Sequence, residues 1–218
     1  MSHLNLSADE VLSTTRAVRK RLDFDRPVDM ALIRECLEIA LQAPSGSNSQ
    51  GWRFVLVTDP GKIAAIAGYY QQAFAEYEAS AYQPTEQHKD RPDMAQTQNR
   101  VLQSAKYLSD NLARIPALLI PCLQGRPDTP GLPQGTMAGM YGSIIPAAWS
   151  FMLAARERGL GTCWTTLHLN FEKEIAELLS IPDEVTQCAL IPIAYTQGTD
   201  FKVGPRKPMD DILHTNSW

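Results

Sequence analysis

The chain has 218 residues, of which 44% are hydrophobic and 20% charged, and its formal net charge is −4. This size predicts a single globular domain over residues 1–218 with a substantial core. The acidic balance argues against general attraction to nucleic acid or anionic lipid. The four cysteines are far apart without a C-x-x-C pair, and no basic region followed by an apolar run opens the chain. Both features favour a reducing cytoplasm over secretion.

The first third of the chain predicts three helices and a strand. Residues 7–10, SADE, form a capping-box pattern, which predicts a helix that continues through VLSTTRAV. Apolar residues recur at helical spacing over 28–41 and predict a second helix there. The run WRFVLV at 52–57 predicts a strand, and a third helix is expected from Pro60 through IAAIAGYYQQAFAEY.

The middle of the chain alternates irregular and regular segments. Residues 81–95 have few apolar side chains and two prolines, so we expect a long loop or lid. A helix is expected over about 96–113, followed by a buried strand in the apolar run 115–123. Residues 124–135 are dense in Pro and Gly and predict a surface connection.

The segment MAGMYGSIIPAAWSFMLAA is about as long as a bilayer span requires and carries no charge. Its glycines, serines and central Pro146 lower its hydrophobicity, and RERG follows directly. We therefore expect a buried core helix that ends at Gly159, and no membrane association.

The last third predicts two strands and a short helix. Residues 160–167 and 187–198 read as strands, with the amphipathic helix FEKEIAELLS between them. The final twenty residues lack periodicity, and their apolar side chains predict contact with a partner subunit. Interleaved helices and about four strands indicate an α+β or α/β chain.

Several chemistries are excluded by the absence of their motifs. The chain has no phosphate-loop, H-E-x-x-H or G-x-S-x-G motif, and GLGTCW lacks the third glycine of a dinucleotide fingerprint and follows a helix. The four histidines have no neighbours at metal-ligand spacing, so no metal site is expected. Cys163 and His168, five apart on one predicted strand, would face opposite sides, so Cys163 is expected to be core.

Two polar clusters remain as candidate sites. Arg16 and Arg19 are three residues apart and would share one side of a helix end, where two guanidinium groups could hold a phosphate. The alternative is a solvated basic helix face over residues 16–26. The loop APSGSNSQGW at 43–52 carries many hydrogen-bonding groups before a buried strand. It suits a polar ligand, and the alternative is a helix cap with an Asx turn.

Four segments together resemble the flavin-dependent nitroreductase family, and its actinobacterial branch with CWTTLH in particular: TTRAVRKRLD, ALQAPSGSNSQGWRFVLV, RGLGTCWTTL and GPRKP. The resemblance implies an α+β sandwich with a central, mostly antiparallel sheet flanked by helices. It also implies a homodimer with active sites at the interface and a C-terminal extension that wraps the partner subunit.

The resemblance further implies FMN as cofactor, with a basic pair and the tail arginine at the phosphate, the polar loop along the ring and ribityl chain, and backbone amides at the reactive edge. The matching residues are Arg16, Ala17, Val18, Arg19, Pro44, Ser45, Asn48, Gln50, Thr165, Thr166, Leu167 and Arg206. The chain departs from the family pattern at Thr15 and Ala17, where arginine and serine are common, so one phosphate donor and one hydroxyl are missing. Lys20 or Arg21 could compensate. It also departs at Gly51, where proline is common. Because the cofactor carries the chemistry, no catalytic side chain is assigned.

The implied reaction is a ping-pong transfer from NAD(P)H through FMN to a nitroaromatic, quinone or similar planar acceptor. Acceptor choice is expected to lie with the aromatic residues of 69–95 and with Met137, Met140 and Tyr141, while His168 is a hypothetical donor to the acceptor's oxygen. Alternatives are a flavin storage or sensing module, a dehalogenating or flavin-fragmenting enzyme on the same scaffold, and a nucleic-acid binder that uses residues 16–26.

Overall fold

Strand β3 (Ala117–Gln124) is the centre of the computed structural model, which describes residues 3–218. All its residues except the last are buried. Leu118 and Ile120 belong to one hydrophobic cluster, whereas Leu119 belongs to another, because alternate side chains of a strand face opposite sides. Both faces are covered, which explains why the sequence of this strand is continuously apolar instead of alternating.

The other strands assemble around β3 into one sheet. Their bounds are β1 (Leu22–Asp23), β2 (Trp52–Val57), β4 (Leu160–Thr162), β5 (Val185–Gln187) and β6 (Ile191–Thr196). The order is β1-β6-β3-β2, with β4 also paired to β6 and β5 to β3, and all these pairings are antiparallel. The predicted antiparallel α+β sheet is confirmed, with six strands in place of about four. Two- and three-residue strands such as β1 and β5 are too short to give a periodic signal.

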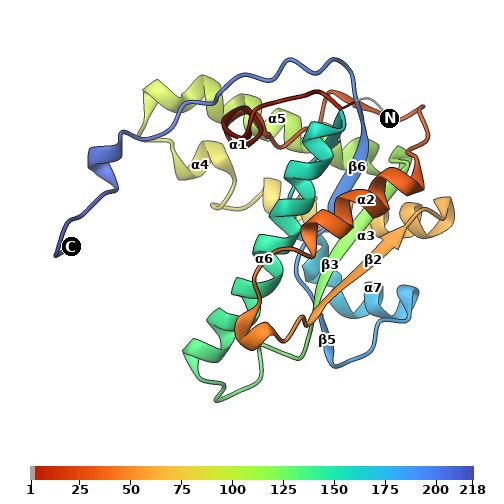
Figure 1. Cartoon of the computed structure of the whole chain (residues 1–218). Helices are drawn as coiled ribbons and strands as arrows, with labels where there is room; N and C mark the ends of the chain where they lie inside the picture. The colour runs from red at the N-terminus through yellow and green to blue at the C-terminus, as the bar shows by residue number, and fades with distance from the viewer. Residues whose placement is uncertain (1–2) are drawn as a thin grey trace.

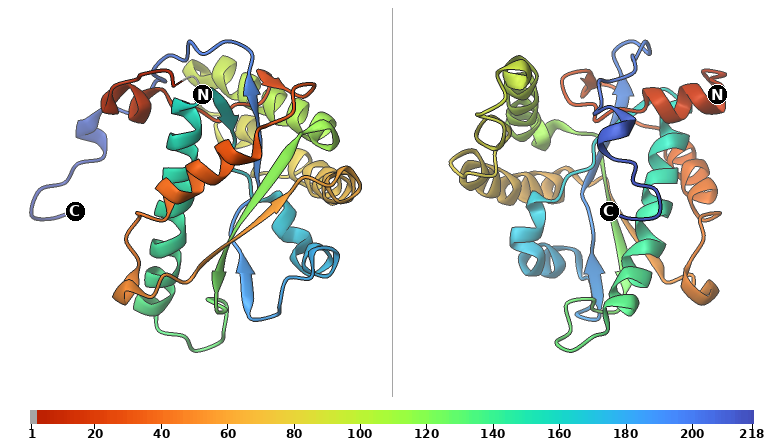
Figure 2. Two further views of the ribbon diagram at one scale, coloured as in Figure 1. Left: turned by 45° about the vertical axis from the view of Figure 1, so that its right-hand side comes forward. Right: turned by 90° about the vertical axis from the view of Figure 1, so that its left-hand side faces the viewer.

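Helices cover both faces of this sheet (Figure 1). The α-helices are α1 (Ala8–Thr14), α2 (Met30–Ala40), α3 (Pro60–Glu78), α4 (Pro84–Gln87), α5 (Ala95–Asn111), α6 (Gln134–Glu157) and α7 (Glu172–Leu179). The 3-10 turns are η1 (Gly46–Asn48), η2 (Pro92–Met94), η3 (Leu112–Arg114), η4 (Leu167–Phe171) and η5 (Met209–Asp211). Figure 2 shows α3, α5 and α7 on one side of the sheet and α2 and α6 on the other. We call these the α3 face and the α6 face.

The first helix is shorter than predicted. It has the capping box at Ser7 but ends at Thr14. The hydroxyl of Thr14 donates to the carbonyl of Glu10 at 2.6 Å, and that of Thr15 donates to the carbonyl of Val11 at the same distance. Such back-bonding weakens a helix, and the chain leaves it in an extended conformation at Thr15.

The two C-terminal strand predictions were also too long, for reasons visible in the register. Strand β4 runs antiparallel to β6 and ends at Thr162, which faces Ile193. The next position on β6 is Pro192, which has no N–H to donate. The predicted strand 187–198 is divided into the end of β5 and β6. Gln187 pairs with Cys122 and Ile191 pairs with Leu119, so an advance of four residues here faces an advance of only three on β3. This is a β-bulge.

The segment predicted as a loop over 81–95 contains the short helix α4 and the turn η2, so only parts of it are irregular. Gln83 is buried, and its side-chain oxygen accepts from the backbone N–H of Thr85 at 3.1 Å. This cap, followed by Pro84 at the first helical position, explains the helix start.

Helix α6 contains the apolar segment and Pro146. Among the described residues it is the one helix long and apolar enough to cross a membrane. In this fold its inner side packs on α2, β2, β3 and β4, where Ala147, Ala148 and Phe151 are fully buried. Its outer side exposes Tyr141, Ile145 and Trp149. The prediction of a core helix is therefore correct for one side of it only.

The chain after β6 crosses the top of the molecule and then leaves it, so that the C-terminus lies away from the body (Figure 1). Apart from η5 this segment is irregular, as predicted. Most of its residues are exposed, including the apolar side chains of Val203, Ile212, Leu213 and Trp218.

Candidate functional site

The basic segment follows α1 and is held by the edge of the sheet. Ala17 forms a parallel bridge with Thr162, and the N–H of Val18 donates to the Thr162 carbonyl at 2.8 Å. Arg16 and Arg19 are therefore on an extended segment, and the expectation that they share a helix end is wrong. Neither guanidinium forms an ion pair within residues 3–218. The two cations remain available for an external anion.

Arg21, considered as a substitute phosphate donor, is already occupied. Its guanidinium donates to the carbonyls of Gln197 and Asp200 at 2.8 and 3.2 Å and to the Asp200 carboxylate at 2.8 Å. It also stacks on the ring of Phe201. These contacts fix the start of the tail. Lys20, the other candidate, is exposed.

The tail passes directly over the basic segment. A Cβ at Gly204 would overlap the guanidinium of Arg16, so the tail backbone and the end of this flexible side chain are in close contact. Arg206 is two residues further along and exposed, with a contact from Nη1 to the Pro205 carbonyl at 2.9 Å. The structure thus brings the GPRKP segment to Arg16.

The turn after β4 lies beside the same arginines. Burial raises the pKa of the Cys163 thiol, and the neighbouring Arg19 opposes that shift. Thr165 is committed to the sheet, because its N–H and its hydroxyl donate to the Leu190 carbonyl at 3.1 and 2.8 Å. Within the described part of the chain, the N–H groups of Thr166 and Leu167 have no acceptor. They are free donors at the start of η4.

Together these segments form what we call the basic half-site: residues 16–19, the turn 165–167 and the tail at 204–206. Tyr70 of α3 lies close to both Arg19 and Thr165, and so to two of these segments. Burial raises the pKa of Tyr70, whereas the charge of Arg19 and a hydrogen bond to Thr165 lower it. Val18, Tyr70 and Cys163 all belong to the cluster of the α3 face.

The polar loop 43–51 contains residues with a strained backbone. Ser47, Asn48 and Gln50 have φ of 52°, 52° and 49°, values that non-glycine residues seldom adopt. The loop is held by the Ser45 hydroxyl, which accepts from the N–H of Gln50 at 3.0 Å, and by the Asn48 side chain, which accepts from that of Gln50 at 3.1 Å. Pro44, Asn48 and Gln50 are exposed, and Ser45 is half-buried.

Ser143 of α6 anchors this loop and was not identified from the sequence. Its hydroxyl accepts from the N–H of Gly46 at 3.0 Å, and its carbonyl accepts from the indole of Trp52 at 2.8 Å. A cleft of about 240 Å³ between the loop and α6 is lined in part by Met140 and Thr136. Its hydroxyl is one of several in α6, and nothing in the sequence marks it as the one that contacts the loop.

The loop and the basic half-site are far apart in one chain. Gly51 accepts from the N–H of Gln124 at the end of β3, whereas Thr162 is level with Ala117 at its start, both facing Ile193. Eight residues of strand separate these positions by roughly 23 Å. The cleft beside the loop is also on the α6 face, with Trp52 and Leu123 in its cluster. The twelve predicted residues therefore form two groups, at opposite ends and on opposite faces of the sheet.

His168 does not lie on an accessible surface. It is fully buried, both ring nitrogens lack a hydrogen-bond partner, and burial lowers its pKa to about 3. The hypothesis that it donates to an acceptor is therefore wrong for this structure, because no ligand reaches a fully enclosed neutral imidazole. It lies in η4 and not on a strand with Cys163, although Cys163 is buried as expected.

The aromatic residues expected to form a lid have divided roles. Tyr70 and Phe74 are core residues, and Tyr69 packs on Phe171 with ring centroids 5.2 Å apart. Tyr77 is half-buried and close to Arg19. Tyr82 is 75% exposed and is the member of this group most open to a ligand.

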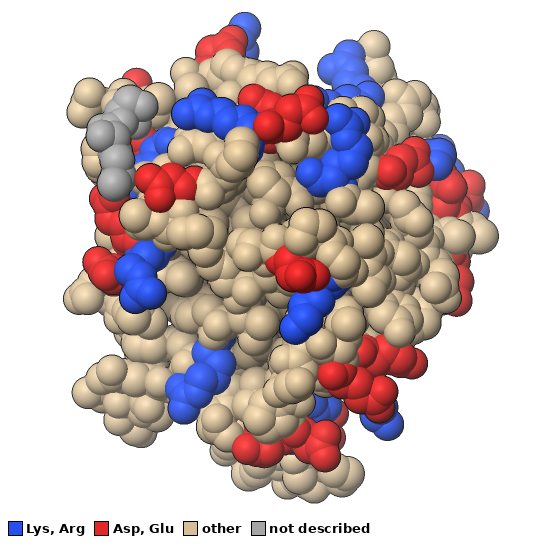
Figure 3. Space-filling view, turned by 90° about the vertical axis from the view of Figure 1, so that its right-hand side faces the viewer, with Lys and Arg blue, Asp and Glu red and all other residues tan. Residues whose placement is uncertain are grey.

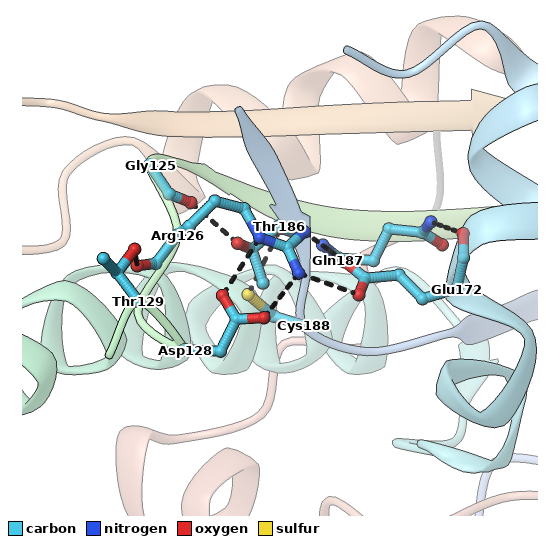
Figure 4. Close-up of polar contacts among 8 residues, drawn as sticks. All are labelled: Gly125, Arg126, Asp128, Thr129, Glu172, Thr186, Gln187 and Cys188. Carbon is cyan, nitrogen blue, oxygen red and sulfur yellow. Dashed lines mark hydrogen bonds and ion pairs between the residues drawn. The ribbon is translucent and has the colours of Figure 1, made fainter. Parts of the chain in front are cut away.

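A second polar cluster, unforeseen from the sequence, surrounds Arg126 (Figure 4). Its guanidinium donates to both oxygens of Asp128 at 3.0 and 2.7 Å and to both of Glu172 at 2.9 and 3.2 Å. These carboxylates raise the pKa of Arg126, which in turn lowers that of Asp128. Because Arg126 bonds both carboxylates, the cluster ties the loop after β3 to α7.

Comparison with known proteins identifies the family. The sequence model described as the Nitroreductase family matches residues 12–195. The chain belongs to the nitroreductase family. It is therefore placed among flavin oxidoreductases, as its four motif segments predicted.

Two curated members of the nitroreductase family, and one solved structure, illustrate the similarity. The chain is 27% identical to 4-nitrobenzoate reductase of Nocardioides sp. (strain LMS-CY), over 86% of this chain and 79% of that protein. It is 33% identical to 5,6-dimethylbenzimidazole synthase of Rhodospirillum rubrum, over 65% of this chain and 61% of that protein. The structure of a mutant of the FMN and NADPH-dependent nitroreductase NfnB, from sphigopyxis sp. strain HMH, superposes with a TM-score of 0.67 at 22% identity, over 98% of this chain and all of that one.

Proposed function

We propose that this protein is an FMN-dependent oxidoreductase that acts as a homodimer. It takes electrons from NADH or NADPH and passes them, in a ping-pong cycle, to nitroaromatic, quinone or similar planar acceptors. One observation carries the proposal: the residues that match the family's flavin contacts form two separate groups in one chain. A two-fold axis would place loop 43–51 of one copy against the basic half-site of the other, and so create two equal sites.

The donors and acceptors on the two groups fit FMN. Arg16 and Arg19, without carboxylate partners, suit its phosphate, and Arg206 is on the tail segment that crosses Arg16. The free N–H groups of Thr166 and Leu167 suit the carbonyl edge of the ring. The hydroxyl and amide groups of loop 43–51 suit the ring edge and ribityl hydroxyls. When bound, FMN supplies hydride acceptance and electron transfer to the second substrate.

The chain's own groups then act by position and electrostatics. N–H groups directed at the ring stabilise negative charge that develops there, because they are fixed by the fold and need no reorganisation. The guanidinium groups hold the phosphate end and so set how far the ring reaches toward the turn 165–167. No acid or base is needed from the protein, and we assign none.

The exposed apolar surface supports the dimer. On α6, Tyr141, Ile145 and Trp149 are spaced four residues apart and are each 39–45% exposed. Large apolar patches on the surface of a chain favour association. The extended tail adds Ile212 and Trp218, whose exposure in one chain is relieved if the tail packs on the partner. We propose that it does.

The nucleic-acid-binding alternative receives less support, whereas the cytoplasmic location that we propose receives some. On the side shown in Figure 3, basic and acidic side chains are interspersed, which does not favour a nucleic-acid surface there. All four cysteines are free and buried, which supports the proposed cytoplasmic location.

The first test is the visible absorption spectrum of the purified protein, followed by steady-state assays with NADH or NADPH and a quinone or nitroaromatic. We expect flavin bands with one FMN per chain, and parallel lines in double-reciprocal plots. Reduction of the flavin without acceptor turnover would favour a storage or sensing module. Loss of the flavin spectrum during reaction with oxygen would favour a flavin-fragmenting enzyme. A colourless protein that takes up no FMN would contradict the proposal.

A further inference from the structure

A groove continues outward from the basic half-site along helix α5. It is lined by Lys20 on one side and by Thr97, Arg100, Val101, Gln103 and Ser104 on the other, with a volume of about 420 Å³. Thr97, Arg100 and Ser104 are three and four residues apart, so they lie on one face of the helix. A second groove of about 280 Å³, lined by residues 16–21, shares Lys20 and Ser104 with the first. The two grooves are therefore adjacent.

The contact between Arg19 and Ser104 fixes the junction of the two grooves. Nη1 of Arg19 donates to the Ser104 hydroxyl at 3.3 Å, and that hydroxyl donates to the Val101 carbonyl at 2.9 Å. Helix α5 is thereby tied to the segment that we propose for the flavin. A ligand that lies over the flavin can extend along α5 without leaving the protein surface.

Two positively charged side chains, Lys20 and Arg100, line this groove together. Arg21, Arg91, Lys106, Arg114, Arg126 and Arg158 all form ion pairs. Lys20 and Arg100 form none within residues 3–218, although both are exposed. Two neighbouring cations without carboxylates, next to the exposed hydroxyl of Thr97, form a donor set for one strongly charged anion.

We propose that this groove binds the 2′-phosphate of NADPH, so that Lys20 and Arg100 make the protein prefer NADPH over NADH. The inference rests on the proposed function and names its electron donor. A phosphate monoester carries nearly two negative charges at pH 7, whereas each phosphate of the pyrophosphate carries one, so a pair of free cations matches the monoester best. Arg16, Arg19 and Arg206 are left for the phosphate of FMN.

The test compares Lys20→Gln and Arg100→Gln with Lys62→Gln, which removes an exposed, unpaired positive charge on α3 instead. Anaerobic stopped-flow measurements of flavin reduction at increasing NADPH and NADH give a Kd for each donor. We expect the Kd for NADPH to rise about tenfold in each groove variant, since each loses one charge-assisted contact. The Kd for NADH should stay within twofold, and Lys62→Gln should match the wild type for both donors.

A second measurement does not depend on flavin reduction. In calorimetric titrations, 2′,5′-ADP should bind the wild type and Lys62→Gln more tightly than 5′-AMP does, and this difference should be lost in the two groove variants. If the groove variants raise the Kd for NADPH and NADH equally, the groove contacts a part of the molecule that both donors share, and the inference is overturned. Unchanged Kd values would overturn it as well. If neither donor reduces the wild-type flavin, the proposed function fails, which is a separate outcome from loss of donor preference.

Discussion

Replacement of Gly161 by alanine tests whether the packing of β4 positions the basic half-site. An alanine Cβ at this position would be 2.8 Å from a methyl of Leu22 and from a methyl of Thr196, and 3.0 Å from a methyl of Val18. Carbon atoms prefer about 3.5 to 4.0 Å, and Leu22 and Val18 are both buried. Each neighbour must therefore shift by up to about 1 Å in a close-packed region.

Overpacking of this kind costs about 1 to 3 kcal/mol. For a chain of this length, each kcal/mol lowers Tm by about 2 to 4 °C, so we expect a loss of about 2 to 12 °C. The shift of Val18 also moves Arg16 and Arg19, because Val18 joins them to the Thr162 carbonyl. We therefore expect weaker FMN binding as well, measured by the change in flavin fluorescence when FMN is added to the apoprotein.

Gly68→Ala is the matched control. Nothing lies within 4 Å of a Cβ at Gly68, and it is inside α3, where alanine stabilises by about 0.5 to 1 kcal/mol relative to glycine. We expect this variant to melt slightly higher and to bind FMN as the wild type does. The reasoning is refuted if Gly161→Ala melts at the wild-type temperature and binds FMN with unchanged affinity.

Three further predictions concern single charges. Arg16→Gln should raise the Kd for FMN about tenfold or more, since it removes one charge-assisted contact to phosphate, and an equal effect in Lys62→Gln would refute this. Because the pKa of His168 is lowered to about 3, only the unfolded chain takes up its proton as pH falls from about 6.5. Stability to urea should therefore fall by up to about 1.4 kcal/mol per pH unit between these values, and His168→Leu should reduce the slope. Arg158 lowers the pKa of Glu35, so their pair stabilises the fold above the ordinary carboxyl pKa. Glu35→Gln should lower the urea midpoint at pH 7, and the difference should shrink as pH falls through the Glu35 pKa.

The sequence predicted the elements whose pattern is local. The helix expected over 28–41 is found at Met30–Ala40, and the strand expected over 52–57 is β2. Each has its own periodicity or apolar run, which depends only on which side is buried. The ends of β4 and β5 were not predictable in this way. They depend on which residues face Pro192 and on the bulge opposite β3, and both follow from the register between strands, which the sequence does not give.

The sequence nominated a set of candidate site residues, which stay predictions, but it could not give their arrangement. Motif segments indicated residues 16–19, 43–52 and 165–167, yet nothing in them states that loop 43–51 lies at the other end of β3. The positioning residues were also missed. Ser143 and Ser104 each hold a key segment through one hydroxyl, and an isolated serine in a helix carries no sequence signal of a distant partner.

The two groups of predicted flavin contacts offer different kinds of group: the loop offers acceptors, and the basic half-site offers donors. Loop 43–51 holds three non-glycine residues with positive φ. This backbone conformation costs about 1 kcal/mol or more for each residue. Within residues 3–218, the hydrogen bonds of Asn48 and Gln50 that could offset this strain lie inside the loop itself. Within residues 3–218, the basic half-site holds cations without carboxylate partners and two N–H groups without acceptors. We propose that one ligand lies between the strained loop of one copy and the unused donors of the other. Flavin binding and dimer formation are then one linked equilibrium, so the apparent affinity for FMN should fall on dilution of the protein below the dimer dissociation constant, and FMN should in turn hold the dimer together.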